Sequence, residues 1–273
     1  MPLAAAIQMT SSPSVAENLS AARELLEQAA ARSVVLAALP ENFAIMGLRE
    51  TDKLSVSETY GDGPIQDWLS RTARELGIWI VGGTMPMRSD ESNRVAAACL
   101  VYDAQGACVA RYDKMHLFDV DIPGRAESYR ESATIAPGSE PRVIDTPIGK
   151  LGLAVCYDMR FPELFRHAVA QGATVLSVPS AFTVPTGLAH WDVLLRARAI
   201  ENLCYVLAPA QVGTHANGRE TYGNAMIVDP WGEVLSRVED VPGIAIAHID
   251  AENQQAMRAR FPALLHRRLH SPD

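Results

Sequence analysis

LGLAVCYDMRFPEL, residues 151–164, runs from an apolar strand into a helix and places Cys156 at the junction. A strand that leads directly into a helix is the repeating step of an α/β fold. A cysteine at such a junction is placed to act as a nucleophile, because the helix N-terminus lowers the thiol pKa and offers backbone N–H groups to an oxyanion. A lone cysteine is otherwise most often a buried packing residue. The junction therefore favours a cysteine-dependent enzyme, provided that other residues supply a base and an oxyanion donor.

The composition is typical of one large globular domain. The chain has 273 residues, of which 48% are hydrophobic, so we expect a single domain over residues 1–273 with a substantial core. The formal net charge is −8, and there is no sustained run of lysine and arginine. An excess of negative charge disfavours binding to nucleic acid or to an anionic membrane. We expect a small-molecule partner instead.

The cysteines and the N-terminus indicate the cellular compartment. Cys99, Cys108, Cys156 and Cys204 show neither CxxC nor Cys/His spacing, so we predict no disulfide framework and no metal site. Residues 1–9 lack a basic flank and a cleavage pattern, and no apolar run reaches transmembrane length. These features favour a soluble protein of the reducing cytoplasm.

Apolar periodicity predicts alternating strands and helices in the N-terminal half. We expect a helix over residues 14–31, where Ser14 is the N-cap and Glu17 completes a capping box. The other predicted elements are strands at 3–9, 34–39 and 78–81, a helix at 64–76, and a hairpin of strands 95–102 and 107–112 around a turn at 103–106. Glu41 follows the second strand, at the end where α/β proteins collect functional groups.

The C-terminal half continues the alternation after a long loop. Residues 114–139 are rich in Asp, Gly, Pro, Glu and Ser and lack periodicity, so we expect one ordered, functional loop. The later predicted elements are strands at 143–145, 174–178 and 205–209, a turn at 146–149, helices at 162–170 and 188–201, and a meander of strands at 225–228, 234–238 and 244–249. This order favours sheets covered by helices over a closed barrel.

A histidine is the usual base for a cysteine nucleophile, but a carboxylate is better placed here. His167 and His190 lie inside predicted helices, whereas Glu41 and Lys114 each follow an apolar strand. A carboxylate deprotonates a thiol when burial and a nearby ammonium bring the two pKa values together, and the ammonium then stabilises the oxyanion. Glu41, Lys114 and Cys156 together are sufficient for amide hydrolysis.

Three sequence blocks, in chain order, resemble the signature blocks of the nitrilase superfamily of carbon–nitrogen hydrolases. They are LPE at 39–41, DKMHLFD at 113–119 and VCYDMRFPE at 155–163, and the similarity extends from residue 7 to residue 268. The resemblance implies a nitrilase-like α/β fold, which is an α-β-β-α sandwich. It also implies hydrolysis without metal or organic cofactor, and a homodimer or higher homo-oligomer that pairs through its helices.

The resemblance also implies roles for individual residues. Glu41 corresponds to the general base, Lys114 to the oxyanion-stabilising cation and Cys156 to the nucleophile. Glu131 matches a second glutamate, which orients the lysine. The remaining positions are expected to bind substrate, with Tyr157 offering its N–H to the oxyanion and Arg160 gripping a carboxylate bidentately, next to Phe182 and Thr186.

Further blocks resemble the branch that contains deaminated glutathione amidase and ω-amidase. They are PSAF at 179–182, the run at 186–201, and the stretch from YGN at 222–224 to VDPWG at 228–232, and the run LLRARAI favours the former enzyme. We expect a carboxylate-bearing substrate, the side-chain amide of a 2-oxo acid, cleaved through a thioester acyl-enzyme with release of ammonia. Deaminated glutathione, a substrate of metabolite repair, is the first choice. Alternatives are 2-oxoglutaramate or 2-oxosuccinamate, a carbamoylase, and a non-catalytic interaction protein. We expect the loops at 129–132 and 211–221 to set the room for the cysteinylglycine tail, which distinguishes the first substrate from the smaller ones.

Overall fold

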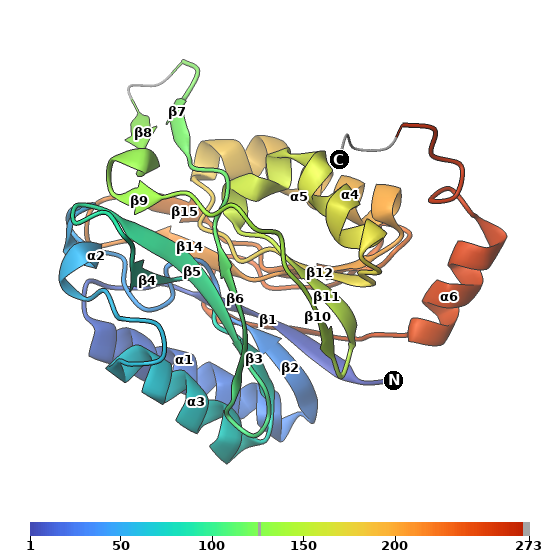
Figure 1. Ribbon diagram of the computed structural model, residues 1–273, viewed down its shortest axis with the longest axis horizontal. Helices are drawn as coiled ribbons and strands as arrows, with labels where there is room; N and C mark the ends of the chain where they lie inside the picture. Colours follow the sequence, from blue (N-terminus) through green and yellow to red (C-terminus); the bar gives the residue numbers. More distant parts are fainter. Residues whose placement is uncertain (125–126, 270–273) are drawn as a thin grey trace.

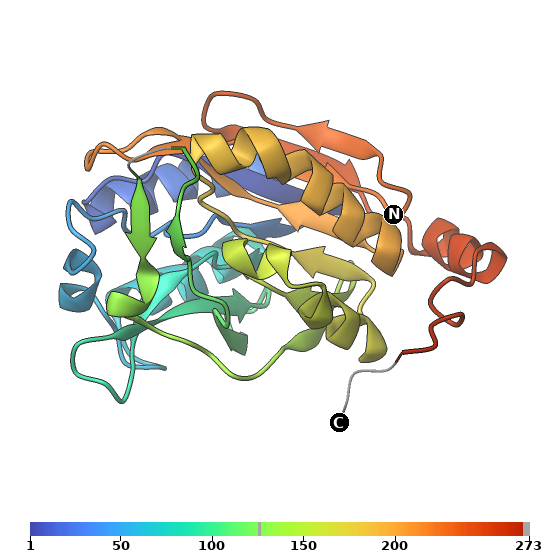
Figure 2. The ribbon, with the colours of Figure 1, turned by 90° about the horizontal axis from the view of Figure 1, so that it is seen from above.

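Two stacked β-sheets lie between two layers of helices in the computed structural model, which describes residues 1–124 and 127–269 (Figure 1). Helices α1 (Val15–Ala31) and α3 (Pro64–Leu76) cover the first sheet, and α4 (Pro162–Ala170) and α5 (Val184–Asn202) cover the second. Figure 2 shows α4 and α5 from above. The arrangement confirms the predicted α-β-β-α sandwich. No helix within the described ranges is long and apolar enough to cross a membrane.

The first sheet is built around its N-terminal strand β1 (Leu3–Met9). This strand pairs in parallel with β2 (Val34–Ala38) and β14 (Ala210–Thr214), and antiparallel with β18 (Gly243–His248). The other strands of this sheet are β3 (Trp79–Val81), β4 (Met85–Arg88), β5 (Val95–Tyr102), β6 (Cys108–Asp113), β9 (Ile135–Ala136) and β15 (Glu220–Tyr222).

The second sheet has the order β10 (Val143–Thr146), β11 (Gly149–Leu153), β12 (Val175–Ser177), β13 (Tyr205–Ala208), β16 (Met226–Val228) and β17 (Val234–Arg237). Strands β11, β12 and β13 are parallel to one another. Their carboxyl ends therefore meet at one edge of the sheet, and the segments that follow them are brought together there.

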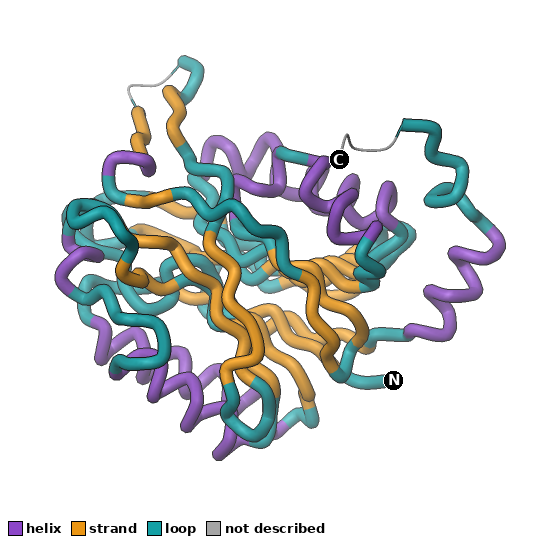
Figure 3. Tube along the Cα trace, viewed as in Figure 1, coloured by secondary structure: helices purple, strands orange, loops and turns teal. Residues whose placement is uncertain are grey.

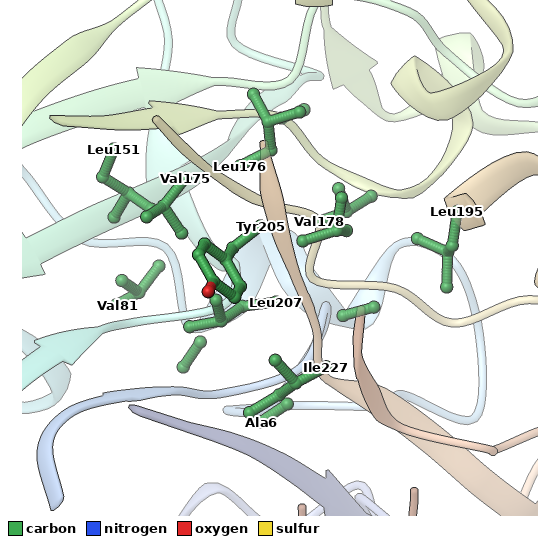
Figure 4. Close-up of a cluster of buried hydrophobic side chains, with 14 of the residues drawn as sticks. Ala6, Val81, Leu151, Val175, Leu176, Val178, Leu195, Tyr205, Leu207 and Ile227 are labelled. Atoms are coloured by element: carbon green, nitrogen blue, oxygen red, sulfur yellow. The ribbon is translucent and has the colours of Figure 1, made fainter. Parts of the chain in front are cut away.

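Side chains of the two sheets form a shared apolar core. Along β1, Ala4 and Ala6 belong to the cluster between the sheets, whereas Ala5 and Ile7 belong to the cluster beneath α1 and α3. This is the two-residue alternation of a strand that is buried on both faces. Figure 4 shows Ala6 in the shared core, with Leu207 and Ile227 of the second sheet.

The predicted long loop at 114–139 is wrong, because the segment contains short regular elements. Strands β7 (Asp119–Asp121) and β8 (Ser128–Arg130) form a hairpin that projects from the sandwich, and a 3-10 helix over Glu131–Ala133 and β9 follow (Figure 3). Both hairpin strands have only three residues, and their side chains are exposed or half-buried. Such short strands have no alternation of apolar and polar residues that periodicity could detect.

Three further expectations need correction. Helix α5 begins at Val184, four residues before the predicted start, because Pro185 occupies its first turn, where proline is well tolerated. The predicted meander is broken, because β18 leaves β17 and pairs with β1 in the other sheet. The capping box is half formed. Ser14 Oγ accepts the Glu17 N–H, but the Glu17 carboxylate accepts from the hydroxyl of Ser12 and not from the backbone N–H of Ser14.

Two more helices complete the fold. The short α2 (Asp52–Ser55) follows the segment after Glu41, and α6 (Ala251–Arg260) lies beyond the edge of the sandwich (Figure 1). Helix α6 docks through polar bonds, since the Gln254 amide and the Arg258 guanidinium both donate to the Leu203 carbonyl, at 2.8 and 3.0 Å. It has no apolar stripe, and periodicity therefore does not predict it.

Candidate active site

Cys156 lies at the edge of the second sheet, directly after β11, and begins a 3-10 helix over Cys156–Arg160. Its backbone φ is +46°, a left-handed conformation that costs a non-glycine residue about 1–3 kcal/mol. Two bonds brace this turn. The Cys156 N–H donates to the Pro179 carbonyl at 2.9 Å, and the Val155 N–H donates to Asp158 Oδ2 at 2.8 Å. The turn thereby fixes the position of the thiol.

A buried ion cluster lies beside the cysteine. Lys114 Nζ donates to Glu41 Oε1 at 2.8 Å and to both carboxylate oxygens of Glu131 at 2.8 Å. Lys114 is 1% exposed and Glu41 4%, and Glu131 also accepts the Phe118 N–H at 2.7 Å. Lys114 follows β6, Glu41 follows β2, and Glu131 starts a short 3-10 helix. Three distant segments are thus brought together by their charges.

The electrostatics of the cluster keep the lysine charged. Burial by itself would lower the pKa of Lys114, but the carboxylates of Glu131 and Glu41 raise this pKa well above its usual value. The side chain is therefore a permanent ammonium at neutral pH, with two negative charges within hydrogen-bonding distance.

The pKa of the Cys156 thiol is raised, whereas a position at a helix N-terminus was expected to lower it. Burial raises the pKa of Cys156 well above its usual value, and the Glu41 carboxylate adds to this rise. Lys114 and a hydrogen bond from the Ala181 backbone lower the pKa only in part. The expected depressed pKa is thus wrong, because the α-helix starts six residues later and the side chain faces a carboxylate. The resting thiol is protonated, and its proton has an acceptor beside it.

Asp158 connects the cysteine turn to the lysine segment, which sequence reasoning missed. Its buried carboxylate accepts from the Tyr112 hydroxyl at 2.6 Å and from the His116 N–H at 3.0 Å, and His116 Nδ1 lies 2.7 Å from it. Tyr112 lies near the end of β6, two residues before Lys114, and His116 follows Lys114 by two residues, so Lys114 lies between the two tethers. Two features of the sequence could have indicated this tether. Tyr112 and His116 are each two residues from Lys114, and Asp158 is two residues after Cys156.

All eight residues expected in the site line one cavity. They are Glu41, Lys114, Glu131, Cys156, Tyr157, Arg160, Phe182 and Thr186. The cavity wall also includes residues of the β7–β8 hairpin, of the segment after Glu41, and of the β14–β15 hairpin, among them Tyr129, Arg49 and Arg219. The β14–β15 hairpin and Tyr129 belong to the two loops, at 211–221 and 129–132, that were expected to make room for the amine half of the substrate. Arg219 itself was not singled out, and Arg49 in the segment after Glu41 was not expected.

Arg160 presents a guanidinium to this cavity between two aromatic rings. Its carbon Cζ lies 5.8 Å from the ring centre of Tyr157 and 5.5 Å from that of Phe182. Both terminal nitrogens lie 3.3 Å from His190 Nδ1, and burial together with the charge of Arg160 lowers the pKa of His190. His190 is therefore a neutral acceptor at neutral pH. Arg160 forms no ion pair with any described residue, so its charge is available to a ligand.

Histidines take no part in the lining of the cavity, as far as the described residues go. His116 is held by Asp158, and His215 is buried with its Nδ1 2.9 Å from the Ser11 carbonyl and its Nε2 2.8 Å from Thr221 Oγ1. In residues 1–124 and 127–269, no three or more His, Cys, Asp and Glu side chains form a group able to hold a metal ion.

Comparison with known proteins relates this geometry to one family. Residues 3–259 match the family described as carbon-nitrogen hydrolase. The deaminated glutathione amidase of Synechocystis sp. is 44% identical over 268 residues, which are 97% of both chains. The mouse protein of the same name is 45% identical over 273 residues, covering 98% of this chain and 84% of its own.

A solved structure shows the same fold. Nit3 of Saccharomyces cerevisiae, a member of branch 10 of the nitrilase superfamily, superimposes with a TM-score of 0.88 at 30% identity. The match covers 98% of this chain and 97% of that one. Sequence similarity and fold therefore agree over nearly the whole length.

The tether between Tyr112 and Asp158 allows a direct test. Tyr112→Phe removes one donor from a buried carboxylate, and bonds to charged groups contribute about 1.5–3 kcal/mol. We expect the free energy of unfolding, measured by urea titration, to fall by about that amount. Tyr60→Phe is the control, because the Tyr60 side chain is exposed and its hydroxyl lies 3.8 Å from the Cys108 sulfur instead of bonding a buried carboxylate. Equal losses of unfolding free energy in both variants would show that the hydrogen bond between Tyr112 and Asp158 does not stabilise the protein more than an exposed hydroxyl does.

Proposed function

The chain belongs to the carbon–nitrogen hydrolase family of the nitrilase superfamily, and we propose that it hydrolyses the γ-amide bond of deaminated glutathione. The observation that carries this proposal is the near-full-length similarity to enzymes of that name. The cavity supports it, because a thiol, a carboxylate and an ammonium lie next to a guanidinium that has no acidic partner among the described residues.

The first half of the reaction makes a thioester. Glu41 takes the thiol proton while the Cys156 sulfur forms a bond to the amide carbonyl carbon. The carbonyl oxygen becomes an oxyanion, held by Lys114 and the Tyr157 N–H. Protonation of Glu41 weakens its bond with the ammonium, which frees one Lys114 N–H for the oxyanion. The carbon–nitrogen bond then breaks, and the leaving nitrogen receives the proton from Glu41.

The second half of the reaction regenerates the enzyme. A water molecule gives a proton to Glu41 and attacks the thioester carbon, and Lys114 and the Tyr157 N–H hold the second oxyanion. The carbon–sulfur bond breaks, and the sulfur recovers the proton from Glu41. Glu131 keeps Lys114 in position throughout, since it bonds the ammonium with both oxygens. Arg160 holds the carboxylate of the 2-oxo acid between the Tyr157 and Phe182 rings, and Thr186 borders the same acyl half.

The leaving group needs correction relative to the sequence-based expectation. The γ-amide nitrogen of deaminated glutathione belongs to its cysteine residue, so hydrolysis releases cysteinylglycine and 2-oxoglutarate. Ammonia would be released only from a primary amide such as 2-oxoglutaramate. The two candidate substrates therefore share the acyl half and the acyl-enzyme, and they differ only in the amine half.

We also propose that the protein acts in the cytoplasm. Cys99, Cys108, Cys156 and Cys204 are all free, and the reaction requires Cys156 as a thiol, which a reducing compartment maintains. Recovery of the protein in a secreted or periplasmic fraction would contradict this location.

We propose a homodimer that forms through α5. Val193 and Ile200 lie two turns apart on one side of this helix and are 68% and 46% exposed. Apolar side chains on the outer side of a covering helix are typical of a surface that a second copy buries. Val193→Glu should therefore shift the mass measured by light scattering from dimer to monomer. Val109→Glu, at another exposed valine, should leave the dimer intact. A monomeric parent protein would refute the proposal.

The substrate is tested by comparing the turnover of three compounds in parallel. The formation of 2-oxoglutarate from deaminated glutathione and from 2-oxoglutaramate, and of the free amino acid from an N-carbamoyl amino acid, are measured in parallel. We expect the largest kcat/KM for deaminated glutathione, and no turnover by Cys156→Ala. A larger kcat/KM for 2-oxoglutaramate would make the protein an ω-amidase instead.

Glu41→Gln separates the charge of the base from its proton transfer. The negative charge of Glu41 raises the thiol pKa, so its removal lowers that pKa while the charge of Lys114 remains. The pH midpoint of Cys156 alkylation by iodoacetamide should therefore shift downward, although kcat/KM falls by about 10²–10⁴-fold. Glu50→Gln is the control, because Glu50 lines the cavity but pairs with Lys53 at 2.7 Å. An unchanged midpoint in Glu41→Gln would argue against Glu41 as the base.

A further inference from the structure

Two half-buried guanidinium groups in the cavity, those of Arg160 and Arg219, form no ion pair with any described residue. The other basic groups of the wall differ in this respect or in exposure. Lys114 lies between two glutamates, Lys53 pairs with Glu50, and Arg130 pairs with Asp121 at 2.9 Å, while Arg49 is exposed. Burial alone would raise the pKa of the Glu50 carboxyl, whereas Lys53 and, more weakly, Arg219 lower it, and Glu50 forms its ion pair with Lys53. The guanidinium groups of Arg160 and Arg219 are therefore available to a bound anion.

Arg219 sits immediately before β15 on the hairpin that joins β14 to β15. Its Nη2 donates to the Ala181 carbonyl at 2.7 Å, and its Cζ lies 5.3 Å from the ring centre of Tyr129. Its Nε is buried without a hydrogen-bond partner among the described residues. A buried donor left unsatisfied is costly, so the free Nε points to an acceptor supplied by a ligand.

The hairpin that carries Arg219 is braced on both sides. The Asn217 amide donates to the Gly47 carbonyl at 2.8 Å, and the Tyr222 N–H donates to the Phe182 carbonyl at 2.9 Å. The guanidinium is also held in plane, with Tyr129 on its face and the Ala181 carbonyl at one nitrogen. A guanidinium that is fixed in this way is prepared for bidentate binding of a planar carboxylate.

The two free guanidinium groups approach one wall segment from different elements. Arg160 comes from the turn after Cys156 and lies over the Phe182 ring, whereas Arg219 comes from the β14–β15 hairpin and bonds the preceding residue, Ala181. The Ala181 backbone also contacts the Cys156 thiol. Both guanidinium groups therefore border the place where the scissile carbonyl must lie. Arg219 contacts Ala181, and Arg160 contacts the next residue, Phe182.

We propose that Arg219 and Tyr129 form a subsite for a second carboxylate, on the amine half of the substrate, so that the enzyme selects amides with a carboxylate on both sides of the scissile bond. This inference rests on the proposed function, in which Arg160 holds the carboxylate of the acyl half. Deaminated glutathione carries the second carboxylate on its glycine, and 2-oxoglutaramate has none. The subsite thus gives a physical reason for the choice between the two substrates.

Kinetics on three substrates test the subsite. They are deaminated glutathione, its glycinamide analogue, which lacks the second carboxylate, and 2-oxoglutaramate, and all three release 2-oxoglutarate. Arg219→Gln should lower kcat/KM for deaminated glutathione by about 10–100-fold, as expected for a lost charge-assisted bidentate contact, and change the other two by less than about threefold. Arg130→Gln is the matched control, because that arginine lines the same cavity but has its own carboxylate partner. A uniform loss on all three substrates, or no loss, would overturn the subsite.

Binding to an inactive protein separates the two proposals. Calorimetry on Cys156→Ala should give about 10–100-fold tighter binding of deaminated glutathione than of its glycinamide analogue, and the further change Arg219→Gln should abolish that difference. If Cys156→Ala binds both equally while the parent enzyme hydrolyses both, the subsite fails and the proposed function stands. If the parent enzyme does not hydrolyse deaminated glutathione while Cys156→Ala still prefers the diacid, the proposed function fails and the subsite stands.

Discussion

The buried Lys114 ammonium between the carboxylates of Glu41 and Glu131 is the interaction on which the rest of the site depends. Leaving one charge of such a cluster without its partner destabilises a protein by about 3–5 kcal/mol. The ends of β2 and β6 and the helix of Glu131 must therefore meet in one arrangement. Asp158 extends this constraint to the second sheet, because its carboxylate binds both tethers of the lysine segment and lies two residues from Cys156. The same set of contacts therefore fixes both the packing of the two sheets and the position of Cys156.

The same cluster explains why a protonated thiol is compatible with catalysis. At rest the cluster holds two carboxylates, one ammonium and a neutral thiol, so its net charge is −1. After the proposed proton transfer from Cys156 to Glu41, the remaining carboxylate and the thiolate still sum with Lys114 to −1. The negative charge passes between two groups of the same buried cluster, since the Glu41 side chain hydrogen-bonds the thiol, and no charge enters the site from outside, so the transfer adds little desolvation penalty. A thiolate formed in solvent and buried afterwards would carry that penalty in full.

Local patterns in the sequence predicted the strand Leu3–Met9, the helix Pro64–Leu76 and the gathering of Glu41, Lys114 and Cys156 in one cavity. Each of these depends on periodicity within one element or on the residues that come directly after a strand. The β7–β8 hairpin was missed because its strands are too short and too exposed to show a period. The loop at 211–221 was expected beside the substrate, but Arg219 was not singled out within it, because its place in the cavity depends on strand pairing between β1 and β14, which lie far apart in the chain. The thiol pKa depends on the same kind of long-range contact.

Charge in this cavity therefore has two separate uses. The inner cluster is balanced within the protein, since Lys114 finds both of its partners among its own side chains, and this arrangement serves bond cleavage whatever amide is bound. The outer guanidinium groups of Arg160 and Arg219 form no ion pair among the described residues, so they are available to a bound anion. Because binding energy differs between substrates only where their groups differ, selection between amides with the same acyl half must come from residues that contact the amine half, which in our proposal is Arg219 and not Arg160. The chemistry is thus fixed by the core of the sandwich, and the choice of substrate by the hairpins at its rim.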